Sequence, residues 1–234
     1  MRLVLLLFRI AAMASDKINQ LEPLWNWSHE DGLVAVGGEL TVDGVLAAYR
    51  KGIFPWYNEG SPVLWWSPDP RAVFDLDGPL VSRRLARTYR GGGFNFTFDQ
   101  SFREVMRACA DDRDDGTWIT NAMLEVYCQL HRLGHAHSIE TWQDGDLVGG
   151  LYGVTVGGLF AGESMFYRVT DASKVAMIRL FEHLRERGYV LFDTQFVTPH
   201  TQRLGAYEIP RREYFRRLTE ALVLPVSFGP PARA

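Results

Sequence analysis

Apolar positions recur with a helical period in several separate segments of the chain. The segment Asp99–Ala110 shows it clearly, with apolar residues at 102, 105, 106 and 109 after Asp99, a predicted N-cap. Helices are predicted for Val42–Lys51, Ser82–Arg90 with Ser82 as its cap, Asp99–Ala110, Asn121–Leu133, Ala172–Arg187 with Asp171 as its cap, and Glu208–Leu222.

Other segments have the pattern of strands joined by tight turns. Alternation predicts strands at His135–Gln143, Leu147–Val156 and Leu159–Phe166, separated by Asp144-Gly145 and Gly157-Gly158 turns. A nearly continuous apolar run at Tyr189–Gln195 is typical of a buried strand. By contrast, three prolines in Gly60–Arg71 favour an extended linker or lip.

The order of these elements predicts an α+β fold. Three strands in a meander, then a helix, a further strand and a last helix require a mixed β-sheet with a crossover. This order is similar to that of the N-acyltransferase (GNAT) superfamily, although a fold does not fix a function. We expect a small N-terminal α/β domain over residues 1–62 and a GNAT-like catalytic domain, its sheet flanked by helices, over residues 63–234.

Composition places the chain among globular proteins. It has 234 residues, of which 47% are hydrophobic and 23% charged, which excludes disordered, collagenous and coiled-coil classes. The net charge of −3 excludes a general attraction to nucleic acid, so any RNA contact must use a local patch. Two cysteines indicate a reducing compartment. The apolar run within Met1–Ile10 is too short for a signal peptide or a membrane span, so we predict a packed strand or helix there, no membrane contact and a cytoplasmic protein.

Common cofactor and metal motifs are missing. The sequence contains no P-loop, no dinucleotide fingerprint, no GxSxG and no HExxH. Cys109 and Cys128 fit buried helical positions, and no further ligands accompany His135 and His137. The segment Tyr167–Lys174 lacks the glycines of a CoA phosphate cradle, and Asp171 would repel a pyrophosphate. We therefore expect no metal and no cofactor.

Three polar residues interrupt apolar strand runs. Glu163 lies within FAGESMF, and Asp193 and Gln195 lie within VLFDTQF. Because residues i and i+2 of a strand share a face, Asp193 and Gln195 are predicted to project together. A carboxylate in such a run is costly unless it is paired. Each of the two acidic residues is therefore either part of a reactive site or a structural carboxylate that is hydrogen-bonded to the backbone.

Nine ordered motifs resemble those of the leucyl/phenylalanyl-tRNA–protein transferases. The resemblance extends from about Asp31 to Tyr214 and rests on the following motifs: GLVAVGGEL, AAYRKGIFPWY, LWWSPDPRAV, GTWIT, LGHAHSIE, LVGGLYGV, FAGESMF, FDTQ and LGAYEIPRREY. It implies transfer of Leu, Phe and Met from aminoacyl-tRNA to the N-terminal Arg or Lys of acceptor proteins. It also implies marking of those proteins for N-end rule degradation, and a GNAT-like fold that uses no CoA.

The resemblance also assigns roles to residues. Asp193 and Gln195 would flank the attacking amine, with Asp193 holding it directly or through Gln195, and Glu163 would hold the donor's α-amino group. The residues matching the family's aminoacyl pocket are Leu151, Phe160, Met165, Met177 and Phe192. Trp56 and Trp118 resemble the residues that pack on the terminal adenosine of tRNA. From the sequence alone, each apolar residue is equally an ordinary core residue.

A basic segment offers a place for tRNA. Val81–Arg90 contains Arg83, Arg84, Arg87 and Arg90 and no acidic residue. Helical spacing puts Arg83, Arg87 and Arg90 on one face, which could follow acceptor-stem phosphates or be merely solvated. Two alternatives to the transferase remain: an acyl-CoA N-acetyltransferase, disfavoured by Tyr167–Lys174, and a non-catalytic module that binds tRNA or N-terminal peptides.

Overall fold

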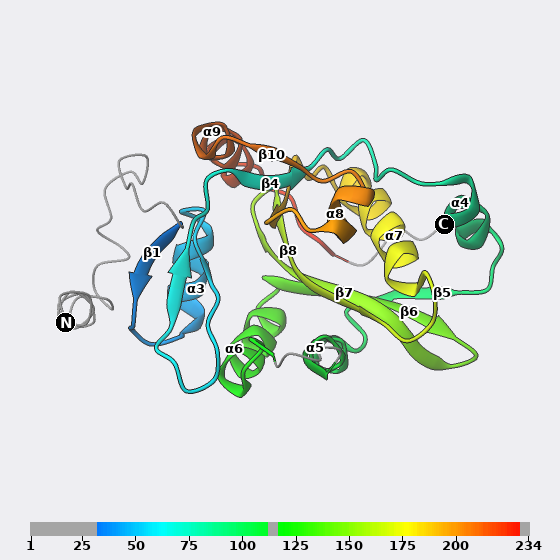
Figure 1. Cartoon of the computed structure of the whole chain (residues 1–234), viewed down its shortest axis with the longest axis horizontal. Coiled ribbons are helices and arrows are strands. Elements are labelled where there is room, and N and C mark those ends of the chain that lie inside the picture. Colours follow the sequence, from blue (N-terminus) through cyan, green and yellow to red (C-terminus); the bar gives the residue numbers. More distant parts are fainter. Residues whose placement is uncertain (1–31, 112–116, 230–234) are drawn as a thin grey trace.

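The computed structural model describes residues 32–111 and 117–229 and contains two β-sheets (Figure 1). The smaller sheet has the strand order β1-β3-β2, formed by β1 (Leu33–Val36), β3 (Leu64–Trp66) and β2 (Phe54–Pro55). Helix α3 (Val42–Tyr49) lies beside it, with Thr41 as its N-cap. The predicted strand or helix at Met1–Ile10 lies outside the described residues.

The larger sheet has seven strands in the order β10-β4-β9-β8-β7-β6-β5. Its strands are β4 (Arg71–Phe74), β5 (Asn95–Phe98), β6 (Ala136–Gln143), β7 (Asp146–Val156), β8 (Leu159–Tyr167), β9 (Leu191–Gln195) and β10 (Tyr207–Ile209). Neighbouring strands are antiparallel except β8 and β9, which are parallel. The predicted α+β fold, the meander β6-β7-β8 and the crossover through a helix are confirmed.

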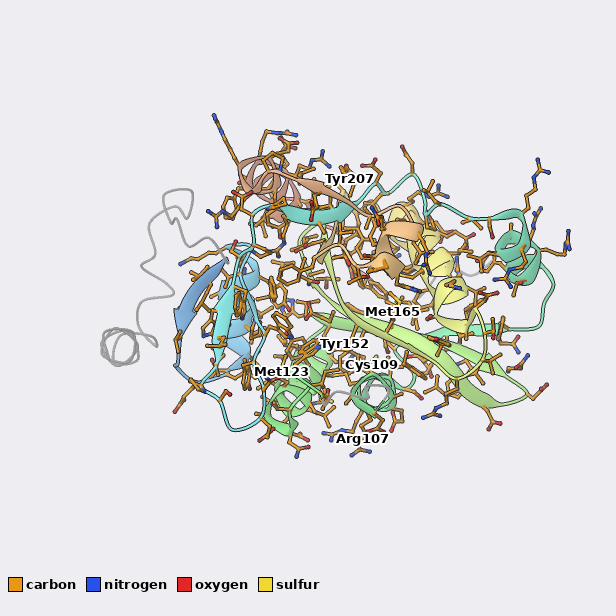
Figure 2. All side chains as sticks on the ribbon, in the orientation of Figure 1. Arg107, Cys109, Met123, Tyr152, Met165 and Tyr207 are labelled. Carbon is orange, nitrogen blue, oxygen red and sulfur yellow. The ribbon has the colours of Figure 1, made fainter. Side chains whose placement is uncertain are left out.

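Helices cover both faces of this sheet (Figure 1). On one face lie α5 (Phe102–Asp111) and α6 (Asn121–Arg132), which share a hydrophobic core with α3. On the other face lies α7 (Ala172–Arg187), whose core residues include Met177 and Phe181. The remaining helices are α4 (Arg83–Arg90), α8 (Pro199–Arg203) and α9 (Arg211–Leu222). Cys109, on α5 in Figure 2, and Cys128 are buried, as predicted.

One predicted helix cap, Asp99, is wrong, and the other, Asp171, is confirmed in position only. Helix α5 begins at Phe102 rather than after Asp99. Asp99 has a left-handed backbone, and its carboxylate accepts hydrogen bonds from His137 and from the Ser138 amide instead. Asp171 occupies the N-cap position of α7 but is also left-handed and makes no capping hydrogen bond. In both cases, groups from other parts of the fold bind the carboxylate that would otherwise have capped the helix.

The segment Gly60–Arg71 is more regular than a linker or lip. It contains β3, which pairs with both β1 and β2, and it ends at the start of β4. Residues Tyr207–Ile209 likewise form β10 before helix α9 begins at Arg211. Because β3 pairs inside the smaller sheet, this sheet extends to Trp66; the division at residues 62 and 63 stays a prediction.

Candidate active site

The central feature is the point where the pairing of β8 and β9 ends. These parallel strands pair from Leu159 with Leu191 to Ala161 with Asp193. Glu163 and Gln195 each lie two residues beyond this last pair. The Gln195 Nε2 atom donates a hydrogen bond to Glu163 Oε1 over 3.2 Å, so the two side chains meet across the opening.

A β-bulge turns Gln195 away from the regular strand pattern. Val73 pairs with Asp193 and Ala72 with Gln195, so Thr194 is an extra residue opposite β4. Gln195 itself has a φ of +59°. The prediction that Asp193 and Gln195 project together is therefore wrong: Gln195 lines a cavity, whereas Asp193 is buried outside the cavity lining.

The Asp193 carboxylate is occupied by partners within the chain. The Arg71 guanidinium binds it in a bidentate manner, with Nε to Oδ1 at 2.8 Å and Nη2 to Oδ2 at 2.6 Å. The Tyr214 hydroxyl donates to Oδ2 at 2.9 Å, and the Gln195 amide donates to Oδ1 at 2.9 Å. Burial alone would lower the pKa of Arg71, but the attraction of Asp193 outweighs it and raises that pKa.

Glu163, unlike Asp193, has uncharged hydrogen-bond partners, and its pKa is raised. The Tyr49 hydroxyl donates to Oε1 at 2.6 Å, and the Tyr127 hydroxyl donates to Oε2 at 3.5 Å. The Tyr49 and Tyr127 hydroxyls also lie 2.9 Å apart. Burial raises the pKa of Glu163 to about 7, and Asp193 adds to the rise, although the tyrosine hydrogen bonds and Arg71 oppose it.

Glu163 and Gln195 belong to a cavity of about 370 Å³. Its lining includes eight of the predicted site residues: Trp56, Trp118, Leu151, Glu163, Met165, Met177, Phe192 and Gln195. Met165 on β8 and Tyr152 on β7, both labelled in Figure 2, come from adjacent strands. Phe160 was predicted to line the aminoacyl pocket, but it lies outside the cavity lining, fully buried, with its ring 5.2 Å from that of Phe192.

The two tryptophans bring an aromatic surface to the same cavity. Trp56 is 42% exposed, and its ring centre lies 5.8 Å from those of Trp66 and Phe196. Trp118 is half-buried and packs against the core that contains α3 and α6. An apolar lining, an aromatic surface and a polar pair therefore occur together in one cavity.

Sequence reasoning missed the residues that support the polar pair. These are Tyr49, Arg71, Tyr127 and Tyr214. It also missed several residues that line the cavity: Thr194, Phe196, Thr198, His200 and Thr201. One signal was available for Arg71, which is a charged residue in the otherwise apolar run RAVF. The cavity residues directly follow Asp193 along the chain, at the end of a buried strand.

The basic helix forms as predicted and lies outside this cavity. Ser82 caps α4 by accepting a hydrogen bond from the Leu85 amide. Arg83, Arg84, Arg87 and Arg90 are all exposed. Arg84 forms an ion pair with Asp171 at 2.6 Å, so the charge of one of the four arginines is partly neutralised within the protein.

Two further observations concern metals and membranes. Over residues 32–111 and 117–229, no group of three or more His, Cys, Asp and Glu could hold a metal ion. No helix in the same ranges is long and apolar enough to cross a membrane.

Comparison with solved structures finds similarity at low identity. One is L-PGS from Bacillus licheniformis, with 16% identity, a TM-score of 0.41, and coverage of 66% of this chain and 52% of that chain. Another is a GCN5-related N-acetyltransferase from Kribbella flavida, with 9% identity, a TM-score of 0.39, and coverage of 70% and 59%.

Comparison of the sequence gives much stronger matches. The family model described as leucyl/phenylalanyl-tRNA protein transferase matches residues 73–219, and the model for its N-terminal domain matches residues 38–69. A leucyl/phenylalanyl-tRNA–protein transferase of Syntrophobacter fumaroxidans is 52% identical over 196 residues, which cover 82% of this chain and 84% of that protein. A transferase of the same name from Yersinia pestis is 45% identical over 218 residues, covering 93% and 92%. The chain belongs to the leucyl/phenylalanyl-tRNA–protein transferase family.

Proposed function

We propose that this protein transfers Leu, Phe or Met from aminoacyl-tRNA to the N-terminal Arg or Lys of acceptor proteins, and so marks them for N-end rule degradation. One observation carries the proposal: a single cavity combines the Glu163–Gln195 pair with two tryptophans and an apolar lining that includes two methionines. The names of the relatives support the aminoacyl-tRNA donor and the protein acceptor. The proposal includes a cytoplasmic location and two domains, over residues 1–62 and 63–234.

The reaction is aminolysis of an ester. The acceptor's α-amine attacks the aminoacyl carbonyl carbon, a C–N bond forms, and the ester C–O bond to the terminal ribose breaks. The amine loses its proton, and the ribose oxygen leaves as a hydroxyl. Because an α-amine has a pKa near ~8, an appreciable fraction is neutral at pH 7, and alignment supplies much of the catalysis. The step needs neither ATP nor CoA, which accords with the absence of glycine from Tyr167–Lys174.

The geometry favours an indirect role for Asp193. Its oxygens already accept hydrogen bonds from Arg71, Tyr214 and the Gln195 amide. We therefore assign it the task of holding Gln195 in its left-handed conformation, so that the Gln195 carboxamide faces the attacking amine. Glu163, next to Gln195, holds the α-amino group of the donor.

The rest of the cavity provides the donor site. Leu151, Met165, Met177 and Phe192 form the slot for the aminoacyl side chain, and the unbranched methionines adapt to either Leu or Phe. Phe160 supports Phe192 from behind. Trp56 and Trp118 pack on the terminal adenosine, and a stacked base contributes ~1–3 kcal/mol. The exposed arginines of α4, Arg83, Arg84, Arg87 and Arg90, contact acceptor-stem phosphates.

The test is transfer of radiolabelled leucine from Leu-tRNA to a protein that begins with Arg, without CoA or ATP. The same protein beginning with Met is the matched control. We expect label only on the Arg form. Salt-dependent tRNA binding without transfer would instead identify a non-catalytic binding module, and transfer only from acetyl-CoA would identify an N-acetyltransferase.

A further inference from the structure

A second cavity, of about 730 Å³, adjoins the first. It lies at the start of α7, beside α4 and α8, and of the residues given roles above only Arg84 lines it. The two cavities share one lining residue, His200. The Nε2 atom of His200 is buried and has no hydrogen-bond partner within the described residues. An unsatisfied polar atom at this junction is a place where a bound ligand would supply a partner.

The second cavity has an excess of positive charge. Arg84, Lys174 and Arg203 line it, against the single carboxylate of Asp171. Asp171 binds Arg84 at 2.6 Å and Lys174 at 2.9 Å, and the hydrogen bond from Arg84 holds the pKa of Asp171 below its usual range. These two cations therefore offset the repulsion that the Asp171 carboxylate would exert on an anionic ligand. Arg203 is exposed and forms no ion pair within residues 32–111 and 117–229, so its charge is available to an anion.

The same cavity also has an exposed aromatic surface. Tyr167, the last residue of β8, is 55% exposed and lines the cavity. Leu80, 67% exposed, adds apolar surface. A cationic groove with an exposed aromatic ring is the combination that binds single-stranded nucleic acid, with cations on the phosphates and rings on the bases.

We propose that this second cavity binds the unpaired nucleotides that precede the terminal adenosine of the donor tRNA. This inference rests on the proposed function. Arg203 and Lys174 contact the phosphodiesters, and a cytosine base stacks on Tyr167. The position fits a continuous path, because His200 connects this cavity to the first one and Arg84 connects it to the exposed face of α4. An acceptor that begins with Arg or Lys would meet like charges here.

The test uses donors of increasing length: leucyl-adenosine, and leucyl esters of the oligonucleotides CA and CCA. Leucyl-adenosine occupies only the first cavity, whereas the longer donors extend into the second. We expect the wild-type protein to show a lower KM for the CCA donor than for leucyl-adenosine. Tyr167→Ala should raise the KM of the CCA donor roughly 5- to 150-fold, the equivalent of one lost stacking contact, and leave that of leucyl-adenosine unchanged.

Matched variants separate stacking from charge. Tyr167→Phe keeps the ring and should keep the low KM for the CCA donor. Arg203→Ala should raise this KM and reduce its salt dependence, with the slope against log salt falling by about one. Arg212→Ala removes the same charge from an exposed position on α9, outside the lining of both cavities, and should do neither.

Several outcomes would overturn the proposal. Equal KM values for leucyl-adenosine and the CCA donor in the wild type would show that the second cavity binds no donor nucleotide, although the transferase function would stand. An Arg203→Ala effect on the KM of the acceptor alone would assign the cavity to the acceptor. If neither these donors nor Leu-tRNA supported transfer, the proposed function itself would fail.

Discussion

Glu163 and Asp193 lie on neighbouring strands near the end of the same pairing, but their surroundings differ. Asp193 is fully buried, and a guanidinium, a phenol and a backbone amide all donate to its oxygens. Glu163 is half-buried and lines a cavity, and its partners are two tyrosine hydroxyls and an amide, all neutral.

The two carboxylates therefore have different roles. The oxygens of Asp193 already accept hydrogen bonds from groups within the protein, so Asp193 fixes the positions of Arg71 and Gln195. Glu163 has a pKa raised to about 7 by burial and has access to the cavity, so it is the group of the two that can respond to a ligand. Residue type alone did not distinguish these roles.

The largest effect expected from this difference is on stability. Arg71→Ala leaves the Asp193 carboxylate buried without its cation, and we expect a loss of about 3–5 kcal/mol in the free energy of unfolding. Urea denaturation of the variant and the wild type measures it. The double variant Arg71→Ala/Asp193→Ala should recover part of the loss, because no unpaired charge remains. A loss below ~1 kcal/mol in Arg71→Ala would contradict the assigned role of this ion pair.

The next effect separates activity from stability. Glu163→Gln removes the charge that we propose holds the donor's α-amino group, and kcat/KM for leucine transfer should fall on the order of 10- to 150-fold at pH 8, the equivalent of one charge-assisted hydrogen bond. The free energy of unfolding should stay level or rise, because burial disfavours the ionised carboxylate.

Asp193→Asn is the matched comparison for that experiment. It makes the same chemical change on the adjacent strand, but it should lower stability and activity together, because the lost charge binds Arg71 and supports Gln195. Wild-type transfer by Glu163→Gln at pH 8 would rule out the donor-binding role.

The local sequence predicted the regular parts of the fold well. Strong amphipathic helices and the meander β6-β7-β8 depend on periodicity and turn residues, both of which are local. Strands β3, β4, β5 and β10 have only three or four residues each, and each pairs with a strand from a distant segment. No local period can specify such strands, because tertiary pairing decides them.

Local sequence patterns were also insufficient to predict the positions of single residues in the site. Glu163, Asp193 and Gln195 could be selected as polar residues in apolar strands. However, the bulge at Thr194 depends on how β9 pairs with β4, so the two-residue period could not show that Gln195 and Asp193 separate. The tyrosines that bind Glu163 come from α3 and α6, which only the folded chain brings together.

The smallest predicted effect is a shift in the pH profile. In the proposed mechanism ionised Glu163 binds the donor, so kcat/KM for the wild type should fall as the pH drops below about 7, the pKa of Glu163. The Tyr49 hydroxyl stabilises the ionised form through a 2.6 Å hydrogen bond. Tyr49→Phe should therefore raise this pKa and move the acidic limb to higher pH by roughly half a unit to one unit.

Tyr127→Phe provides the graded control for this shift, because its hydroxyl lies 3.5 Å from Glu163 and stabilises the charge less. Both variants should reach near wild-type rates at pH 8 to 9, where Glu163 is ionised in each. In Glu163→Gln the acidic limb near pH 7 should be absent, leaving the titration of the acceptor amine near ~8. A limb that stays near pH 7 in Glu163→Gln would assign the titration to another group and leave Glu163 as a fixed hydrogen-bond acceptor, much closer in role to Asp193.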